Sequence, residues 1–415
     1  GTAYLLAEAW RRQAGHSTMD FSRWLRSSRK LLVHGSGESR RLPGYAPIGK
    51  PMLPLPVLKD LRGQRPDQVL LDLQCQSYER LFRHAPDRYR VMVTCGDVLI
   101  RFAETPPAYA DADVMIVGIA ASPDEAQRHG VMVCSEDDPG RMRCFLQKPS
   151  AETLQTAAAG APYYLDSGIW LLSERAVMTL LAKCGWVAQE GRFRNTQPDV
   201  YALFSSFGPA LGVSPTSEDA DIRALTSAVL PLEDGRFYHF GTNQSIFNSV
   251  SELQHPITDK HSFGHETAPS VGRNVVQHAK VACELSASNR FVWIENASIP
   301  PTWQLTERHV ITGLPENTWR LCLPPGACID AVPLTGGGAC PRTHGFDDGF
   351  RGPLGSQDTL WFGRPARNWF SARQIDLETA GLKPDTDIQA APLFPVLNVN
   401  EVDEDFIAWL LAESP

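Results

Sequence analysis

Short apolar runs alternate with helix-like segments along the first 250 residues or so of the chain. A run of four to eight apolar residues between turn residues is typical of a buried strand, whereas apolar residues three and four apart predict a helix. The pattern predicts strands at 30–34, 89–95, 113–119 and 163–172, a hairpin at 131–134 and 144–147, and helices at 67–82, 174–182 and 242–253. Strands that alternate with helices indicate an α/β domain with a mostly parallel sheet.

The pattern changes after residue 274. Short apolar runs follow one another with Gly, Pro, Asn or Asp between them: VVQHAKV, FVWIENASI, HVITGL and WRLCLP. Such runs favour a β-helix-like or β-sandwich-like domain. The polar segment 255–274 is expected to be a linker, so the predicted domains are 1–254 and 275–415. The second domain is expected to end in loops and an amphipathic helix at 403–412.

Composition narrows the class of protein further. The net charge of −8, from 39 Lys and Arg against 47 Asp and Glu, speaks against non-specific binding to nucleic acid or membrane surfaces. Nine cysteines without a C-x-x-C pair argue against a zinc ribbon and a disulfide framework. No apolar run approaches the ~20 residues of a membrane span, and no secretory signal is visible. We therefore expect a cytoplasmic protein with reduced thiols.

A loop after the first predicted strand carries candidate phosphate-binding groups. The strand at 30–34 leads into the sequence GSGESRRL. A glycine-bearing loop after a strand exposes backbone N–H groups that can bind phosphate oxygens, which makes Ser36, Gly37 and Ser39 candidates. Arg40 and Arg41 add guanidinium groups, whose planar donors suit phosphate.

Three further short motifs follow in order. Lys50 stands before a proline and would suit a polyphosphate, and Gly96-Asp97 ends the strand at 89–95. A carboxylate at the carboxyl edge of a parallel sheet is well placed to bind Mg²⁺. Lys148, in the triplet Gln-Lys-Pro, follows the predicted hairpin. Taken alone each motif is weak, because Gly-x-Gly loops and Gly-Asp or Lys-Pro pairs are usually ordinary turns or solvated sites.

The joint order of these motifs resembles that of the sugar-1-phosphate nucleotidyltransferases. Their pattern runs G-G-x-G-T-R-L, then a lysine before proline, G-D, E-K-P and N-x-G. This chain has SGESRRL, KP, GD, QKP and DSG in the same order. Serines stand in place of two loop glycines, Gln147 in place of the glutamate and Asp166 in place of the asparagine.

Longer segments point to a narrower relationship. SRRLPGYAPIGK, HGV, FLQKPS, DSGIWLLSERAV, FYHFGT, WIENASI, HVITGLPENTW and TDIQAAPLFPVL together resemble the guanylyltransferase half of the bifunctional L-fucokinase/L-fucose-1-phosphate guanylyltransferases. The resemblance implies a Rossmann-like nucleotidyltransferase domain followed by a β-helix-like domain. It implies the reaction of GTP with β-L-fucose 1-phosphate to give GDP-L-fucose and pyrophosphate, with Mg²⁺ as cofactor. The chain resembles the transferase module alone, so a fused or separate L-fucokinase domain is an expected partner, and a homo-oligomer is left open.

The resemblance also assigns roles to the charged residues. Asp97 would bind Mg²⁺, which would bridge the phosphates of the two substrates. Arg41 and Lys50 would hold the β- and γ-phosphates of GTP, and Lys148 would contact the phosphate of fucose 1-phosphate. Further nucleotide contacts are expected from Gly1, Thr2, Ser36, Gly37, Ser39, Arg40 and Gly96.

The sugar pocket is expected to include Asp166, Gly168, His239 and Thr242. His239 stands where many nucleotidyltransferases carry a second metal-binding aspartate, but Mg²⁺ prefers oxygen ligands. Either one carboxylate holds the metal, or His239 contacts sugar or phosphate; a structural histidine bonded to the backbone is a further alternative. Two rival functions also stay open: transfer to another hexose 1-phosphate, and a non-catalytic module that retains the fold.

Overall fold

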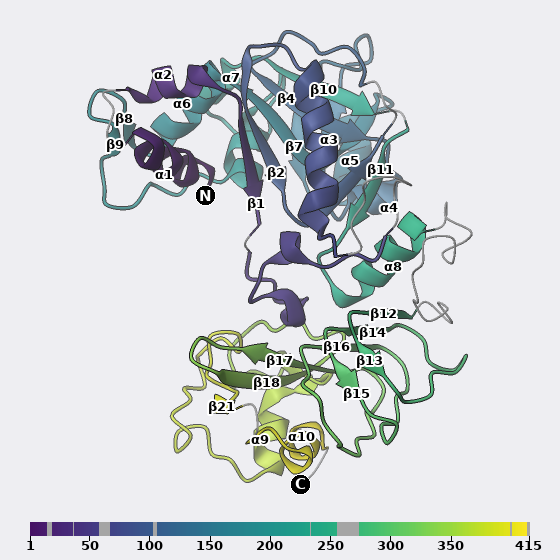
Figure 1. Ribbon diagram of the computed structural model, residues 1–415. Coiled ribbons are helices and arrows are strands. Elements are labelled where there is room, and N and C mark those ends of the chain that lie inside the picture. The colour runs from purple at the N-terminus through teal and green to yellow at the C-terminus, as the bar shows by residue number, and fades with distance from the viewer. Residues whose placement is uncertain are drawn as a thin grey trace. The chain divides into compact units, whose positions relative to one another are not determined.

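The computed structural model describes residues 1–14, 19–35, 37–57, 67–102, 106–232, 234–254, 274–398 and 401–412. The chain divides into two compact units (Figure 1). Unit 1 comprises Gly1–Gly35 and Leu71–Tyr238, and unit 2 comprises Ser36–Leu70 and His239–Pro415. Along the described residues no helix combines the length and apolar character needed to cross a membrane.

Unit 1 is built on a seven-stranded mixed sheet. Its main path runs β1-β2-β7-β4-β10, and β5 pairs with both β6 and β7. The strands of this part of the chain are β1 (Lys30–His34), β2 (Tyr89–Cys95), β3 (Val98–Arg101), β4 (Val114–Ile119), β5 (Gly130–Cys134), β6 (Met142–Gln147), β7 (Tyr163–Ser173), β8 (Trp186–Val187), β9 (Arg192–Phe193), β10 (Ser227–Leu232) and β11 (Arg236–His239). The strands predicted at 30–34 and 89–95, and the hairpin of β5 and β6, are confirmed.

The prediction of a mostly parallel sheet needs correction. β1 and β2 are parallel, as are β4 and β10, but β7 lies antiparallel to β2, β4 and β5. With the β5–β6 hairpin, antiparallel pairings therefore outnumber parallel ones in this sheet. The apolar pattern of a buried strand is the same in either direction, so it identified β7 as a strand without giving its orientation.

Helices cover both faces of this sheet (Figure 1). They are α1 (Thr2–Ala14), α2 (Phe21–Ser27), α3 (Leu70–His84), α4 (Pro123–Ala126), α5 (Ala151–Ala158), α6 (Glu174–Lys183) and α7 (Ala220–Arg223), with a π-turn at Leu203–Phe207 and a 3₁₀ turn at Gly208–Ala210. Successive side chains of β2 point to opposite faces. Val91 and Val93 pack in the cluster that contains α1, α2 and α6, whereas Met92 packs with Tyr78 and Leu81 of α3.

Unit 2 contains parallel strands that recur every 17 or 18 residues. Its main sheet runs β12-β14-β16-β17-β18-β21. Val275 pairs with Trp293, and Trp293 pairs with Val310, as successive parallel neighbours. Gly313 has a φ of 70°, and a Cβ there would collide with the carbonyl oxygen of Ala331, so this corner between coils requires glycine. The β-helix interpretation stays a prediction; the regular parallel register is what supports it.

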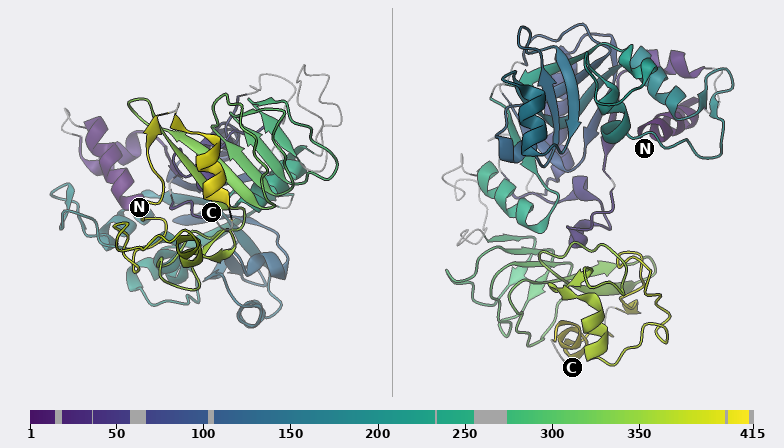
Figure 2. Two further views of the ribbon diagram at one scale, coloured as in Figure 1. Left: turned by 90° about the horizontal axis from the view of Figure 1, so that it is seen from below. Right: turned by 180° about the vertical axis from the view of Figure 1, so that it is seen from behind.

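The remaining strands and helices of unit 2 complete its core. The elements are two 3₁₀ turns, η1 (Pro43–Tyr45) and η2 (Lys50–Met52), the helices α8 (Asn243–Gln254), α9 (Ala366–Ala372) and α10 (Glu404–Leu411), and the strands β12 (Val275–Gln277), β13 (Lys280–Val281), β14 (Val292–Glu295), β15 (Ser298–Ile299), β16 (His309–Thr312), β17 (Ala327–Pro333), β18 (Gly338–Gly345), β19 (Leu360–Trp361), β20 (Arg364–Pro365) and β21 (Leu397–Asn398). The predicted terminal helix is confirmed as α10, which lies against the strands of unit 2 (Figure 2). Its Ile407 and Leu410 are buried in one cluster with residues of these strands.

The division into units differs from the predicted domain boundary at residue 254. The segment 37–57 packs on the β-rich part: Trp293 Nε1 donates to the Tyr45 hydroxyl at 2.7 Å, and Arg342 donates to the carbonyl of Pro43 at 2.9 Å. Helix α8 joins it through Phe247, whose ring contacts Trp293 edge-on. These partners lie more than 45 residues apart in sequence, so no local pattern predicts them. The predicted linker at 255–274 lies, except for Asn274, outside the described residues.

Candidate functional site

The carboxyl ends of β1 and β2 meet at one edge of the unit 1 sheet. His34 is the register partner of Cys95, and the N–H of Gly96 donates to the carbonyl of His34 at 3.0 Å. Asp97 follows directly and is half-buried. The predicted Gly96-Asp97 motif therefore lies where a parallel strand pair ends, which is a common position for ligand-binding groups in open α/β sheets.

The bend of β7 lies against the same strand end. Gly168 has a φ of 75°, and a Cβ at this position would approach Cys95 Sγ to 2.8 Å. Only glycine allows both the backbone conformation and this close contact. The pairing of β4 with β7 shifts register here, between Ile116 and Gly118. β7 therefore bends at Gly168, and such bulges commonly redirect side chains beside active sites.

Asp166 lies inside this bend and has internal hydrogen-bond donors. Its Oδ1 accepts from the N–H of Gly168 at 2.8 Å, and Trp170 Nε1 donates to both carboxyl oxygens at 3.1 and 3.2 Å. The residue is 6% exposed, and burial raises the pKa of its carboxyl to about 7. These contacts show how the side chain predicted for the sugar pocket holds the bend of β7.

Lys148 comes to the same edge at the end of the β5–β6 hairpin. Its N–H donates to the carbonyl of His129 at 3.0 Å, and its φ of 48° turns the chain out of the strand. Gly130, next to His129, is so close to Asp166 that a Cβ there would lie 3.2 Å from the carboxylate. The Lys148 side chain is exposed. The edge therefore gathers the backbone at Lys148, Asp166 and Gly168.

The first residues of the chain also reach this edge. Thr2 is buried, and its hydroxyl makes a 2.9 Å hydrogen bond with His34 Nε2. Burial lowers the pKa of His34. Gly1 is exposed just before α1 begins. Sequence reasoning did not select His34, although its place between a buried strand and a glycine loop was a signal for it.

The two arginines of the loop lie in unit 2 and have different surroundings. Arg40 donates to Asp387 at 2.6 Å, to the carbonyl of Phe350 at 2.8 Å and to Glu38 at 2.5 Å. The side chain of Arg41 is exposed and, among the described residues, makes no hydrogen bond or ion pair. Arg40 therefore anchors the loop, whereas Arg41 presents its guanidinium to solvent.

Five other predicted residues belong to the described part of unit 2. Lys50 begins η2 directly after Gly49, and its side chain is half-buried. Thr242 caps α8, because its hydroxyl accepts from the N–H of Ser245 at 3.0 Å. The carbonyl of His239 accepts from Ser249, and Ser39 is buried. Gly37 is exposed in the loop, and Ser36 lies outside the described residues.

The donor set of unit 1 fits one mode of Mg²⁺ binding. Among the described residues no group of three or more His, Cys, Asp or Glu side chains could hold a metal ion. Mg²⁺ is usually bound through one or two carboxylates together with substrate phosphates and water, rather than by a protein cage. The half-buried Asp97 carboxylate suits that mode.

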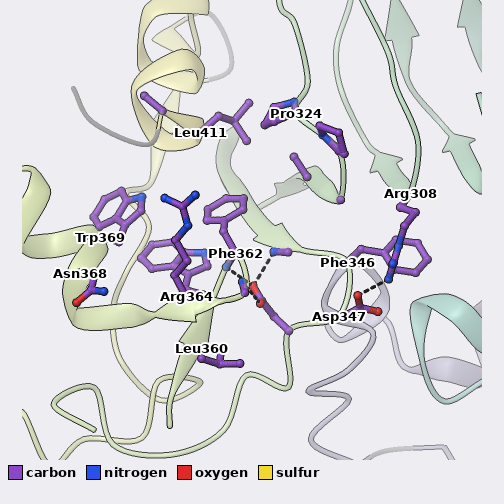
Figure 3. A pocket seen from close by; sticks show the side chains of 18 of the residues that line it. Arg308, Pro324, Phe346, Asp347, Leu360, Phe362, Arg364, Asn368, Trp369 and Leu411 are labelled. Carbon is purple, nitrogen blue, oxygen red and sulfur yellow. Dashed lines mark hydrogen bonds and ion pairs between the residues drawn. The ribbon is translucent and has the colours of Figure 1, made fainter. Parts of the chain in front are cut away.

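The described part of unit 2 contains cavities away from the sheet edge of unit 1. The first, of about 510 Å³, is walled by Phe362 and Trp369 and bordered by an Arg308–Asp347 ion pair (Figure 3). None of the predicted site residues lines it. The second, of about 250 Å³, lies beside Ser39 and Arg40 of the loop.

Comparison with known protein families matches one part of the chain to a single domain model. Residues 22–190 match the model of the fucose pyrophosphorylase domain. This range contains Gly96, Asp97, Lys148, Asp166 and Gly168. Residues 22–190 therefore resemble a fucose pyrophosphorylase domain, and the resemblance found in the motifs is confirmed.

Two curated relatives match most or all of the chain. The chain is 38% identical over 413 residues to an L-fucokinase/L-fucose-1-P guanylyltransferase of Bacteroides fragilis, covering 100% of this chain and 43% of the relative. It is 23% identical over 447 residues to a bifunctional fucokinase/GDP-fucose pyrophosphorylase of Arabidopsis thaliana, covering 94% of this chain and 40% of that protein. The chain thus spans less than half the length of these curated relatives.

The comparison with solved structures gives matches of low sequence identity. A mannose-1-phosphate geranyltransferase of Thermus thermophilus has a TM-score of 0.41 and 13% identity, over 78% of this chain and 96% of that one. An inositol-1-phosphate CTP transferase of T. maritima has a TM-score of 0.32 and 11% identity, over 56% of this chain and 98% of that one.

Proposed function

We propose that this chain transfers guanylyl groups, converting GTP and β-L-fucose 1-phosphate to GDP-L-fucose and pyrophosphate. The observation that carries the proposal is that the Gly96-Asp97 turn, the end of the Lys148 hairpin and the Asp166–Gly168 bend lie at one sheet edge inside the range that matches the fucose pyrophosphorylase domain. The identity of 38% to the Bacteroides guanylyltransferase over the whole chain supports the same substrates.

The chemistry requires positioning and charge neutralisation. An oxygen of the sugar phosphate attacks the α-phosphorus of GTP, and the bond from this phosphorus to the oxygen of the departing pyrophosphate breaks. The attacking oxygen is already ionised at neutral pH, so no side chain needs to remove a proton. Rate enhancement then comes from holding the phosphates in line and offsetting their charge, which fits the exposed cations and the half-buried carboxylate.

Asp97 is the proposed ligand for Mg²⁺. When bound, the cation would offset the negative charge of the substrate phosphates and of the departing pyrophosphate. The side chain starts from a turn at the carboxyl end of β2, and the residue is half-buried there. With a single carboxylate, the remaining ligands would be phosphate oxygens and water.

In this proposal, different basic side chains bind the phosphates of the two substrates. Lys148 is exposed beside the Asp166–Gly168 bend, so it would bind the phosphate of fucose 1-phosphate while the bend shapes the sugar site. Arg41, whose guanidinium is exposed, and Lys50 would bind the β- and γ-phosphates of GTP. His239 and Thr242 would contact the sugar side.

The test is pyrophosphate release measured with GTP, ATP, UTP and CTP against fucose 1-phosphate, mannose 1-phosphate and glucose 1-phosphate. We expect turnover with GTP and fucose 1-phosphate that chelation of Mg²⁺ abolishes. Preference for another hexose phosphate would favour the rival nucleotidyltransferase, and no turnover with any pair would favour a non-catalytic module.

A kinase in the same pathway is the proposed partner. The two curated relatives are named as bifunctional proteins with a fucokinase, and such a kinase would supply fucose 1-phosphate. We expect this chain alone to form no fucose 1-phosphate from fucose and ATP. Formation of that product would contradict the single-module assignment.

A further inference from the structure

The Gly96-Asp97 turn leaves one sheet and enters another. β2 pairs with β1 and β7, whereas β3, which follows the turn, pairs with β11 in a separate two-stranded sheet. The ladder of β2 therefore ends at Cys95, where the N–H of Gly96 still bonds to β1. The hydrogen bonds on both sides of the turn therefore hold the backbone from which the Asp97 side chain starts.

Helix α3 supplies side chains that hold both sides. Gln74 Nε2 donates to the carbonyl of Val98 at 2.8 Å and to the carbonyl of Cys95 at 3.4 Å. The hydroxyl of Tyr78, one helical turn later, also donates to the carbonyl of Cys95 at 3.3 Å. These two carbonyls flank the Gly96-Asp97 pair. One helix therefore fixes the turn at its entry and at its exit.

Burial makes these hydrogen bonds persistent. Gln74 is 0% exposed and Tyr78 is 2% exposed, so water does not compete for the carbonyls. Gln74 also has an energetic cost, because its buried Oε1 has no hydrogen-bond partner within the described part of the chain. An unsatisfied buried acceptor costs roughly 1–3 kcal/mol, which an apolar side chain of the same size would avoid. An amide at this position is therefore explained by the hydrogen bonds that Gln74 Nε2 donates, rather than by packing in the core.

We propose that Gln74 is a positioning residue that orients Asp97 for its cation, with Tyr78 as its auxiliary. This inference rests on the proposed function, in which Asp97 binds Mg²⁺. A carboxylate that binds metal is normally held by hydrogen-bonded groups behind it, and loss of such a group typically lowers metal affinity by roughly 10- to 100-fold. Here the support acts through the backbone of the turn.

The experiment compares Gln74→Met with a matched control, Ser77→Ala. Ser77 lies on the same helix, is 3% exposed and donates to the carbonyl of Ile100 at 3.1 Å, which is beyond the turn. Isothermal titration calorimetry measures GTP binding in MgCl₂ and in EDTA. The ratio of the two dissociation constants reports the contribution of the metal without any turnover.

We expect Gln74→Met to reduce this ratio by about tenfold or more, and Ser77→Ala to leave it unchanged. Binding of GTP in EDTA should stay the same in both variants. Tyr78→Phe removes one hydroxyl and keeps the ring, so it should reduce the ratio in the same direction, by less. It provides the comparison if Gln74→Met does not fold.

The outcomes distinguish failure of the metal-ligand role of Asp97 from failure of the positioning role of Gln74. A wild-type ratio of one would remove Asp97 as a metal ligand, and this inference would fall with that part of the proposed function. A wild-type ratio well above one that Gln74→Met and Tyr78→Phe both retain would overturn the positioning role alone. Equal loss in Ser77→Ala would also overturn it, because the effect would then be general loosening of α3.

Discussion

Two adjacent arginines in the loop are predicted to respond to the same substitution in opposite ways. Arg40 is 20% exposed and bound to Asp387 and to the carbonyl of Phe350, whereas Arg41 is exposed and, in the described part of the chain, has no side-chain partner. Only the backbone of Arg41 is engaged, since its carbonyl accepts from Asn243. Replacing each by Gln removes the charge and keeps a polar side chain.

The expected magnitudes follow from these contacts. A hydrogen bond from a charged group contributes about 1.5–3 kcal/mol when well formed, and partial exposure reduces this value. The bonds from Arg40 to Asp387 and Phe350 should together contribute about 2 kcal/mol to the free energy of unfolding. For a unit of this size that corresponds to a fall in Tm of about 4–8 °C. Arg41→Gln should change stability by less than about 0.5 kcal/mol.

The binding assay should give the reverse order. If Arg41 meets the phosphates of GTP, its loss should weaken GTP binding by roughly 10- to 100-fold. Calorimetric unfolding without ligand and GTP titration of the same preparations give both quantities. An Arg41→Gln variant that binds GTP normally would refute the assignment of this side chain. An Arg40→Gln variant with an unchanged Tm and lost GTP affinity would show that Arg40 binds nucleotide, as the sequence suggested, rather than anchoring the loop.

Three further expectations concern the carboxylates and the lysines. Asp97→Asn should lower turnover by about 100-fold or more, roughly 3 kcal/mol in the barrier, with unchanged circular dichroism; an active variant with the same Mg²⁺ requirement would exclude it from the metal site. Lys148→Met should raise KM for fucose 1-phosphate roughly 10- to 100-fold, while Lys50→Met should chiefly lower kcat, and a kinetic matrix against both substrates checks this. The carboxyl pKa of Asp166 is about 7 in the folded state, above its unfolded value of about 3.9, so the native state binds more protons between these pH values. Stability should therefore fall as pH rises from about 4 to about 7, by up to about 4 kcal/mol, and urea unfolding of Asp166→Asn should lose this part of the pH dependence.

The sequence predicts the bounds of strands well where the apolar residues form a continuous run. β2 matches its predicted bounds, since a continuous apolar run is recognisable when both faces of a strand are buried. The edge strand β1 also matches its bounds, although Leu32 is its one buried residue. The position of Gly96-Asp97 follows from the end of β2, and the bend at Gly168 follows from a glycine inside a strand. In these places the local residues themselves determine the structure.

The contacts that were missed join residues far apart in the chain. Arg40 bonds to Asp387, 347 positions later, so its role as an anchor has no local signal. Gln74 occupies an inward position of α3 where the helical pattern expects an apolar side chain, and its partners belong to the following strands. The sequence therefore indicates which residues have suitable chemistry, while the fold determines which of them remain exposed to use it.

This distinction changes how the basic groups of the chain are interpreted. A guanidinium that is bound to a carboxylate and a carbonyl on its own unit, as in Arg40, must break those bonds before it can bind phosphate, and this cost is subtracted from its affinity. Arg41 and Lys148 have exposed side chains and avoid that cost. Asp97 is half-buried, and the buried amide of Gln74 holds the turn behind it. A group that can bind substrate is therefore distinguished from a structural one by whether its own side chain or a neighbouring residue makes the hydrogen bonds that hold the fold.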